Sequence, residues 1–276
     1  MKERYESSPK EVERMNTEEL RSNFLVENLF SKGKANFVYS HYDRMVMGGI
    51  IPTTKAINLQ NYDALKSKFF LERREIGIIS IGGKGTITAD RKSYNLEKLS
   101  CLYLGRGTKK VSFESSSKSK PAQFFLFSAP AHKEYPSTLY TKEKALPFEL
   151  GSSQTSNHRT IYKYIHPAGI ESCQIVMGLT VLKDGSVWNT MPAHTHNRRS
   201  EVYCYFDVPK NHGVMHFMGQ PQETRHLWVQ NNQAIISPPW SIHAGSGTAN
   251  YSFIWAMAGE NQDFADMDFV ELKNIR

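Results

Sequence analysis

The stretch IGIISIGGKGTITADRKSYNLEKLSCLYLGRGTKKVSFES, residues 76–115, decides the fold class of this chain. In it, short apolar runs rich in Ile, Thr, Tyr and Val alternate with glycine-rich or charged turns. Gly82-Gly83, Ala89-Asp90-Arg91 and Gly105-Arg106-Gly107 supply the turn positions that hairpins need. Short strands with turn signals every roughly 8–12 residues are typical of antiparallel sandwiches and barrels. The stretch therefore predicts a β-sandwich or barrel in the first half of the chain.

The β pattern continues at residues 122–130 (AQFFLFSAP) and returns in the second half of the chain. Residues 135–156 contain Pro, Ser and Lys without a clear period, so we expect them to connect two halves. β-type segments then resume at RTIYKYIHP (159–167) and run to NYSFIWAMAG (250–259). We predict an all-β chain of two jelly-roll or barrel domains, 1–140 and 141–276, with a few short helices.

Helical periodicity is confined to two places near the start of the chain. Within about the first 30 residues, Leu20, Phe24, Leu25 and Leu29 form one apolar stripe, which predicts a helix leading into the first domain. A second short helix is expected over residues 61–71, NYDALKSKFFL.

Composition bounds the class of protein and its surroundings. The 276 residues are 39% apolar and 12% aromatic, which excludes a disordered chain. No apolar run is long enough for a membrane span, and the charged start lacks the apolar core of a secretory signal. The three cysteines, Cys101, Cys173 and Cys204, are dispersed, as expected for reduced thiols. We therefore expect a cytoplasmic protein without a membrane partner.

The net charge of +7 admits two readings, a nucleic-acid binder or a protein that attracts a small anion. Nucleic-acid binders concentrate basic residues in stripes interleaved with aromatic residues. Here the densest basic patches, residues 66–75 and 108–120, are short, and they mix charge signs or are rich in serine. An anionic metabolite is therefore the expected partner, and nucleic acid is not.

The histidines cluster in the second half of the chain, where eight of the ten lie between His158 and His243. In MPAHTHNRRSEVYCYF, His194 and His196 are two residues apart, so on a strand both side chains leave the same face. Glu201 follows after a short bend, and His243, after Pro238-Pro239, is the best candidate for a further ligand. A lone histidine is more often structural, but three imidazoles and a carboxylate suit Zn²⁺, Fe²⁺ or Mn²⁺.

These motifs resemble the two signature motifs of the cupin superfamily, although the Gly185–His194 and His243–Asn250 spacings are longer than the common pattern. Five blocks also resemble the 5-keto-4-deoxyuronate isomerase family along essentially the whole chain. The blocks are IGGKGTITAD, LYLGRGT, RTIYKYIHP, MPAHTHNRRSEVYCYF and SPPWSIHAGSGTANYSFIWAMAGEN.

The resemblance implies a bicupin fold and a hexamer. It further implies a ketol-isomerase that converts 5-dehydro-4-deoxy-D-glucuronate to 3-deoxy-D-glycero-2,5-hexodiulosonate in pectin breakdown. One Zn²⁺ per chain would be held by His194, His196, Glu201 and His243. The first half has no HxH motif, so we expect its barrel to lack that metal and to have a structural or oligomer-contact role.

An isomerase of this kind needs a proton carrier, and a substrate carboxylate calls for a basic partner. The candidate proton carriers are Glu201, Lys163 and Tyr251, with His226 and Glu223 behind them. Arg225 is the first choice for the carboxylate, followed by Lys163 and Arg159. Arg198 and Arg199 lie beside the metal motif but are expected to face solvent.

Two other functions fit the same residues. An Fe²⁺-dependent cupin dioxygenase would use an identical ligand set, and a non-catalytic sugar-acid-binding cupin would need only the cavity and the charge.

Overall fold

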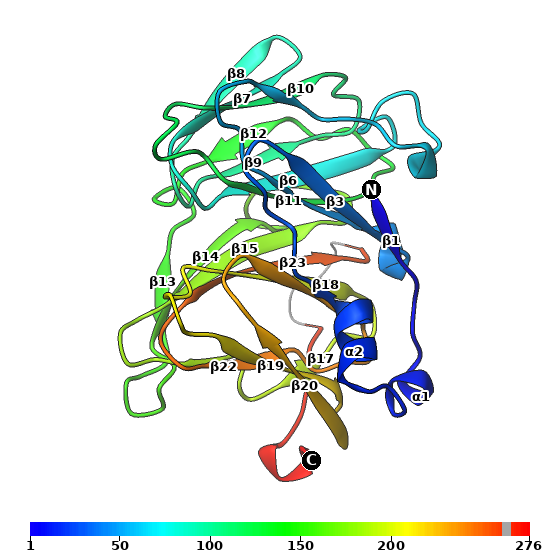
Figure 1. The fold of residues 1–276 in the computed structure, drawn as a ribbon, viewed down its shortest axis with the longest axis vertical. Coiled ribbons are helices and arrows are strands. Elements are labelled where there is room, and N and C mark those ends of the chain that lie inside the picture. The colour runs from blue at the N-terminus through cyan, green and yellow to red at the C-terminus, as the bar shows by residue number, and fades with distance from the viewer. Residues whose placement is uncertain (261–265) are drawn as a thin grey trace.

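The computed structural model describes residues 1–260 and 266–276, and these residues form the predicted all-β architecture with few helices. The chain folds into two β-sandwiches, each made of one seven-stranded and one four-stranded sheet, stacked one above the other (Figure 1). A two-stranded sheet completes the second sandwich. The short strands and frequent turns of the sequence thus form the same two-sheet arrangement in each half of the chain.

The first sandwich contains a seven-stranded sheet in the order β1-β3-β4-β11-β6-β9-β12 and a four-stranded sheet in the order β5-β10-β7-β8. Its strands are β1 (Lys2–Arg4), β3 (Ala35–Ser40), β4 (Val46–Ile50), β5 (Ile57–Asn58), β6 (Arg74–Ser80), β7 (Gly85–Ala89), β8 (Lys92–Leu96), β9 (Cys101–Leu104), β10 (Val111–Ser115), β11 (Phe124–Pro130) and β12 (Thr138–Tyr140).

The second sandwich repeats this plan, with orders β13-β14-β15-β23-β18-β21-β2 and β16-β22-β19-β20, and adds the pair β17-β24. Its strands are β2 (Leu25–Val26), β13 (Phe148–Leu150), β14 (Arg159–Ile165), β15 (Val176–Leu182), β16 (Trp188–Asn189), β17 (His194–Thr195), β18 (Ser200–Phe206), β19 (Val214–Gln220), β20 (Glu223–Val229), β21 (Gln233–Ser237), β22 (Ala244–Gly247), β23 (Ser252–Ala258) and β24 (Asp268–Phe269).

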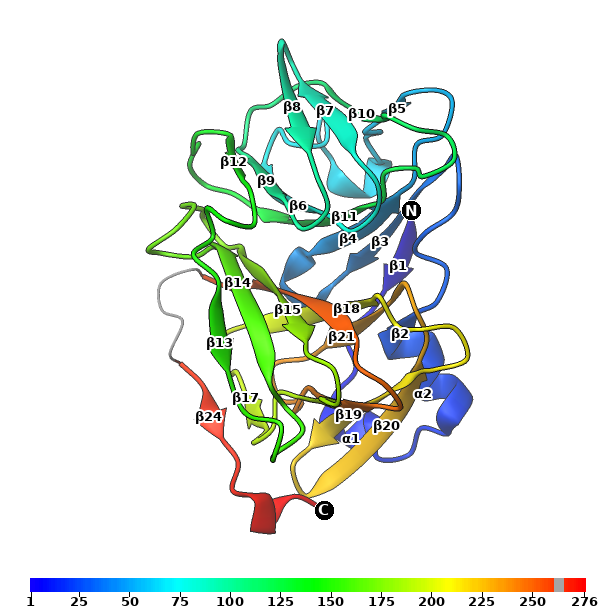
Figure 2. The same ribbon diagram turned by 90° about the vertical axis from the view of Figure 1, so that its left-hand side faces the viewer.

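The two seven-stranded sheets face each other at the centre of the molecule, and the four-stranded sheets lie at its outer ends (Figures 1 and 2). A Cβ on Gly77 of β6 would lie 2.6 Å from Met177 Sδ and 2.7 Å from Ile165 Cδ1, both in the second sandwich. Because a seven-stranded sheet is covered on both faces, its strands read as continuous apolar runs such as Phe124–Phe127. The close contact makes the two sandwiches one packed body.

A buried carboxylate crosses this interface. Glu75 of β6 is fully buried and accepts hydrogen bonds from the Tyr103 hydroxyl at 2.7 Å and from the Cys173 amide at 2.8 Å. It also accepts from the amides of Gln174 at 2.7 Å and Ile175 at 3.0 Å. The three amides belong to the second half of the chain, so Glu75 fastens the loop before β15 to the first sandwich.

The predicted helices are shorter than expected, and one of them packs elsewhere. The leading segment forms two helices, α1 (Pro9–Val12) and α2 (Thr17–Phe24), each started by a capping box. α2 then runs into β2, which pairs with β21 of the second sandwich. The segment is therefore anchored on the second half and not on the first, because its apolar stripe is covered there.

In residues 1–260 and 266–276, the three remaining helical elements are single 3₁₀ turns. They are η1 (Tyr42–Arg44), η2 (Asp63–Leu65) and η3 (Leu272–Asn274). The helix predicted over residues 61–71 is thus wrong except for the turn η2, because its apolar residues cover the first core from an irregular segment. Within the described residues, no helix is long and apolar enough to cross a membrane.

Candidate metal centre

Three elements of the second sandwich converge on the histidine cluster. His194 lies in β17, which pairs with β24 so that His194 stands opposite Phe269. His196 follows directly after β17, and His243 immediately precedes β22. Glu201 is the second residue of β18, where Glu201, Tyr203 and Tyr205 alternate with residues on the other face. The structure therefore brings together the four side chains that the sequence proposed as ligands.

The facing atoms of these side chains are closely spaced. His194 Nε2 lies 3.2 Å from His196 Nε2 and 3.0 Å from His243 Nε2. Glu201 Oε2 lies 3.4 Å from His196 Nε2 and 3.1 Å from His243 Nε2. The three imidazoles form a group whose ligand atoms all lie within 4.8 Å of one another.

The donor set fits a tetrahedral divalent cation. Ligand bonds of about 2.0–2.1 Å place tetrahedral ligand atoms about 3.3 Å apart, close to the spacings observed here. Glu201 Oε2 is buried and has no hydrogen-bond partner within the described part of the chain. A buried anionic oxygen without a partner is costly, and a cation bound between the four side chains would satisfy it.

The electrostatics of the cluster also suit a metal. Burial, reinforced by the neighbouring His243 and His196 rings, lowers the pKa of His194 to about 3. Burial lowers the pKa of His243 well below its ordinary value, and the His196 ring adds to this effect. Both imidazoles are therefore neutral near pH 7, and a neutral imidazole offers the lone pair that a metal needs.

A pocket of about 420 Å³ opens from the cluster, and its lining includes His194, His196 and Glu201. Arg159, Ile161 and Lys163 of β14 line its wall, as expected for alternate residues on one face of a strand. Lys163 Nζ lies 5.2 Å from the centre of the Phe148 ring. Of the sequence candidates for a carboxylate partner, Lys163 and Arg159 are thus at the pocket.

Arg225 is not at the pocket, and its assignment as the carboxylate partner is wrong. Its guanidinium donates to Glu13 O at 2.8 Å and pairs with Glu223, so it ties β20 to the end of α1. His226 is exposed on the same strand. The alternation of side chains along β20 shows which residues share a face. It does not show that the sheet containing β20 lies at the outer end of the second sandwich (Figure 1).

Tyr251 is also absent from the pocket lining. It is buried deeper in the second sandwich, where its hydroxyl accepts from Asn189 Nδ2 at 2.6 Å and donates to Val187 O at 3.1 Å. The candidates for proton transfer that do line the pocket are Glu201 and Lys163.

The two arginines beside the metal motif behave differently from the expectation. Arg199 is 1% exposed and lines the pocket, and its Nη2 lies 3.2 Å from His196 Nδ1. It forms an ion pair with Asp266, which also pairs with Arg198 at 2.8 Å. The prediction that Arg199 faces solvent is therefore wrong, because the chain after β23 returns to this site and supplies a carboxylate.

Sequence reasoning also missed Tyr203 and Thr190, which line the pocket and whose hydroxyl oxygens lie 2.7 Å apart. Burial raises the pKa of Tyr203 well above its ordinary value, and the Glu201 charge adds to this effect. The available signal was alternation along β18, since Tyr203 follows Glu201 by two residues.

Solved structures similar to this chain support the fold. An IolB-like protein from Salmonella typhimurium matches with a TM-score of 0.72 at 13% identity, covering 90% of this chain and 97% of that one. A variant of Bacillus subtilis oxalate decarboxylase matches with a TM-score of 0.61 at 12% identity, covering 89% and 79%. At these identities the likeness concerns the fold alone, which is cupin-like as expected.

Curated relatives are much closer in sequence. The 4-deoxy-L-threo-5-hexosulose-uronate ketol-isomerase of Halalkalibacterium halodurans is 55% identical over 276 residues, which is 100% of both chains. The protein of the same name from Formosa agariphila is 54% identical, covering 99% of this chain and 98% of its own. The family model described as KduI/IolB family matches residues 24–272. The resemblance expected from the sequence is thereby confirmed, and the chain belongs to the KduI/IolB family.

Proposed function

We propose that this chain is a ketol-isomerase that converts 5-dehydro-4-deoxy-D-glucuronate to 3-deoxy-D-glycero-2,5-hexodiulosonate during pectin breakdown. The observation that carries the proposal is the cluster of partly buried His194 with buried His196, His243 and Glu201, which opens into a pocket with basic side chains. Full-length relatives at 55% identity bear the name of this activity.

The proposed resident metal is Zn²⁺, one per chain, held by the four side chains of the cluster. When bound, a divalent cation would act as a Lewis acid that stabilises negative charge on the substrate oxygens during the isomerisation. Three imidazoles and one carboxylate also accept Fe²⁺ or Mn²⁺, so metal analysis of the purified protein decides the identity.

The basic side chains of β14 are proposed to hold the substrate. Arg159 lines the pocket with its Nη1 bonded to Asn157 O at 2.8 Å, which fixes the direction of its guanidinium. A guanidinium binds a carboxylate in a bidentate manner, so we assign the uronate carboxylate to Arg159. With the carboxylate on Arg159, the reacting end of the sugar is proposed to face the histidine cluster, which lines the same pocket.

The remaining polar groups of the pocket are proposed to handle protons at the substrate oxygens. An arginine keeps its proton, and the raised pKa of Tyr203 keeps its hydroxyl protonated, so neither side chain serves as a base. Lys163 is the other basic residue on the same face of β14, and we assign to it the exchange of protons with the substrate oxygens. Tyr203 and Thr190 would then orient substrate hydroxyls by hydrogen bonding.

The test is an anaerobic isomerisation assay combined with elemental analysis of the purified protein. Turnover without oxygen, with about one metal per chain, supports the proposal. Oxygen consumption that depends on the sugar would instead identify a cupin dioxygenase. Binding of the sugar without turnover in the metal-loaded protein would identify a binding module.

The assembly and the location of the protein are part of the same proposal. We propose a homo-oligomer, specifically a hexamer, in the cytoplasm, on the basis of the family resemblance and the three free cysteines. Sedimentation of the purified protein measures the assembly. Cell fractionation measures the location.

A further inference from the structure

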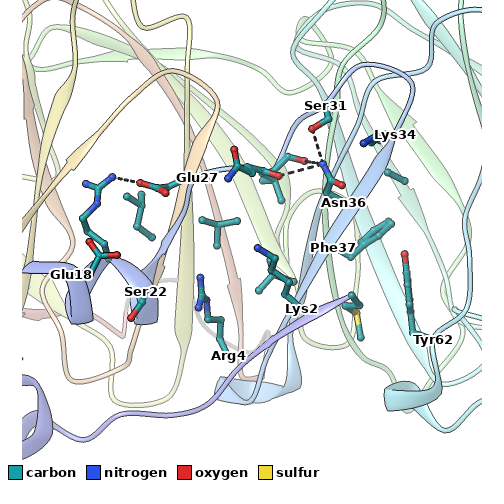
Figure 3. Close-up of a pocket in the computed structure, with 18 residues that line it drawn as sticks. Lys2, Arg4, Glu18, Ser22, Glu27, Ser31, Lys34, Asn36, Phe37 and Tyr62 are labelled. Carbon is teal, nitrogen blue, oxygen red and sulfur yellow. Dashed lines mark hydrogen bonds and ion pairs between the residues drawn. The ribbon is translucent and has the colours of Figure 1, made fainter.

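A second, larger cavity lies far from the histidine cluster, between the two sandwiches. Its volume is about 650 Å³, within the range of small-molecule sites. β1 and β3 of the first sandwich form one side, and α2 and β2, which pack on the second sandwich, form the other (Figure 3). The metal ligands do not line it, and its lining shares no residue with the metal pocket.

The lining of this cavity combines apolar side chains with an excess of basic ones. Four basic side chains and two acidic ones line it. Arg21 and Glu27 pair with each other, and Arg21 also donates to Trp228 O, so this pair contributes little net charge. The remaining basic residues are Lys2, Arg4 and Lys34.

Of these three cations, Lys2 and Lys34 are exposed, and Arg4 is partly buried. No hydrogen bond or ion pair joins the side chain of Lys2, Arg4 or Lys34 to a residue in 1–260 or 266–276, and Arg4 Nε is buried without a hydrogen-bond partner. Burial lowers the pKa of Arg4, and the Glu27 charge offsets part of this effect. Figure 3 shows Lys2 and Arg4 extending from β1 into the space between α2 and β3. A buried guanidinium nitrogen without an acceptor is costly, and an anion bound in the cavity would supply that acceptor.

The cavity lining also contains aromatic rings and neutral polar groups, the side chains that carbohydrate sites use. The rings of Phe37 and Tyr62 lie 5.7 Å apart and form an aromatic wall. Within the described residues, the Tyr62 hydroxyl and the Asn28 side-chain amide have no hydrogen-bond partner, although both side chains line the cavity. Asn28 is exposed and Tyr62 is partly exposed, so hydroxyl groups of a ligand would replace solvent at these two side chains.

We propose that this cavity binds a small polyhydroxylated anion, either a sugar acid or a sugar phosphate, with its carboxylate or phosphate on Arg4 and Lys2, which lie two residues apart on one face of β1 (Figure 3). The two sources share the same recognition chemistry, an anionic group next to several hydroxyls. The site bridges the two sandwiches, because β1 belongs to one seven-stranded sheet and β2 to the other. It is separate from the metal pocket and does not depend on the proposed isomerisation.

The experiment is calorimetric titration of the full-length protein with four probes: inorganic phosphate, D-galacturonate, glucose 6-phosphate and neutral D-glucose. We expect saturable binding of at least one anionic sugar, weaker with rising salt, and no binding of glucose. The arms with galacturonate and glucose 6-phosphate separate a sugar acid from a sugar phosphate. The protein carrying His194→Ala should bind the probe in this cavity as wild type does, since His194 does not line it.

The variant Arg4→Gln/Lys2→Gln tests the location of the site. It should weaken binding at least tenfold while isomerase activity and the circular dichroism spectrum stay as in wild type. The matched control Lys118→Gln removes an exposed charge of the first sandwich far from the cavity and should leave binding unchanged. Each single variant provides a check if the double variant fails to fold.

Three results would overturn the proposal. The first is that no anionic probe binds the wild-type protein saturably. The second is probe binding that Arg4→Gln/Lys2→Gln keeps at wild-type strength, whether or not His194→Ala loses it. The third combines two findings: no probe binds the wild-type protein, and the double variant has a different oligomeric size from wild type. Together these would identify the cavity as a contact between copies of this chain.

Discussion

Replacing Glu75 with Gln should destabilise the whole molecule, although this residue lies outside the metal pocket. Glu75 is fully buried and accepts four hydrogen bonds, one from Tyr103 and three from the amides of Cys173, Gln174 and Ile175. Two donors face each carboxylate oxygen. In a glutamine, one oxygen becomes an NH₂ group that faces donors and cannot accept from them.

The magnitude follows from this geometry. The best arrangement places the new NH₂ beside Tyr103, whose hydroxyl can rotate to accept, and leaves one amide unsatisfied. An unsatisfied buried amide costs about 1–3 kcal/mol. The other three bonds lose their charge assistance, about 0.5–1 kcal/mol each. We therefore expect the free energy of unfolding to fall by about 3–5 kcal/mol, in line with other broken buried charge networks.

The assay is equilibrium unfolding in urea, followed by circular dichroism and by tryptophan fluorescence. All four tryptophans lie in the second half of the chain, so fluorescence reports the second sandwich while circular dichroism reports both. The control Glu97→Gln removes an exposed carboxylate that pairs with exposed Lys84, and it should change stability by less than about 1 kcal/mol. An unfolding midpoint of Glu75→Gln equal to that of the control would refute the reasoning.

Three further predictions concern the second sandwich. His194→Ala should reduce both the bound metal and the isomerase activity by more than about 100-fold. The control His212→Ala alters an exposed histidine outside the cluster and should leave both unchanged. Full activity of metal-depleted protein would contradict the metal mechanism. Arg159→Met should raise KM by about tenfold or more, because it removes one charge-assisted hydrogen bond to the substrate carboxylate. Steady-state kinetics measure this change, and Arg91→Met, which alters an exposed arginine, is the control. Burial lowers the pKa of His216 to about 3 from 6.5, so only the unfolded chain takes up this proton as the pH falls. Stability should therefore decrease below pH 6.5, by up to about 1.4 kcal/mol per pH unit from this residue. His216→Gln should flatten the slope by one proton in urea titrations at several pH values, and an unchanged slope would contradict the assignment.

The local pattern of the sequence determined the fold class and pointed to the histidine cluster. A strand alternates its side chains with period two whatever lies around it, so His194 and His196 could be placed on one face without a structure. Turn residues such as Gly82-Gly83 likewise act on their own neighbours. The all-β architecture, its duplication and the family resemblance were therefore accessible from the chain alone.

Choosing between candidates on equivalent strands required the tertiary structure. Arg159 and Arg225 both lie on β segments of the second half, yet one lines the metal pocket and the other ties β20 to α1. Periodicity gives the face of a strand but not which sheet covers that face. The carboxylate assignment therefore moved from Arg225 to Arg159 only when the sheet order was known.

Interactions between distant segments were decided by the tertiary structure alone. Glu75 finds its amide partners about 100 residues further on, and Arg199 pairs with Asp266 after β23 has crossed the sheet. α2 and β2 also join the second sandwich, although in the chain they lie between β1 and β3 of the first. The sequence shows that Glu75 ends a charged stretch directly before the apolar run that begins at Ile76, but its partners depend on how two sheets stack. That stacking is set by packing over the whole chain, which no local pattern records.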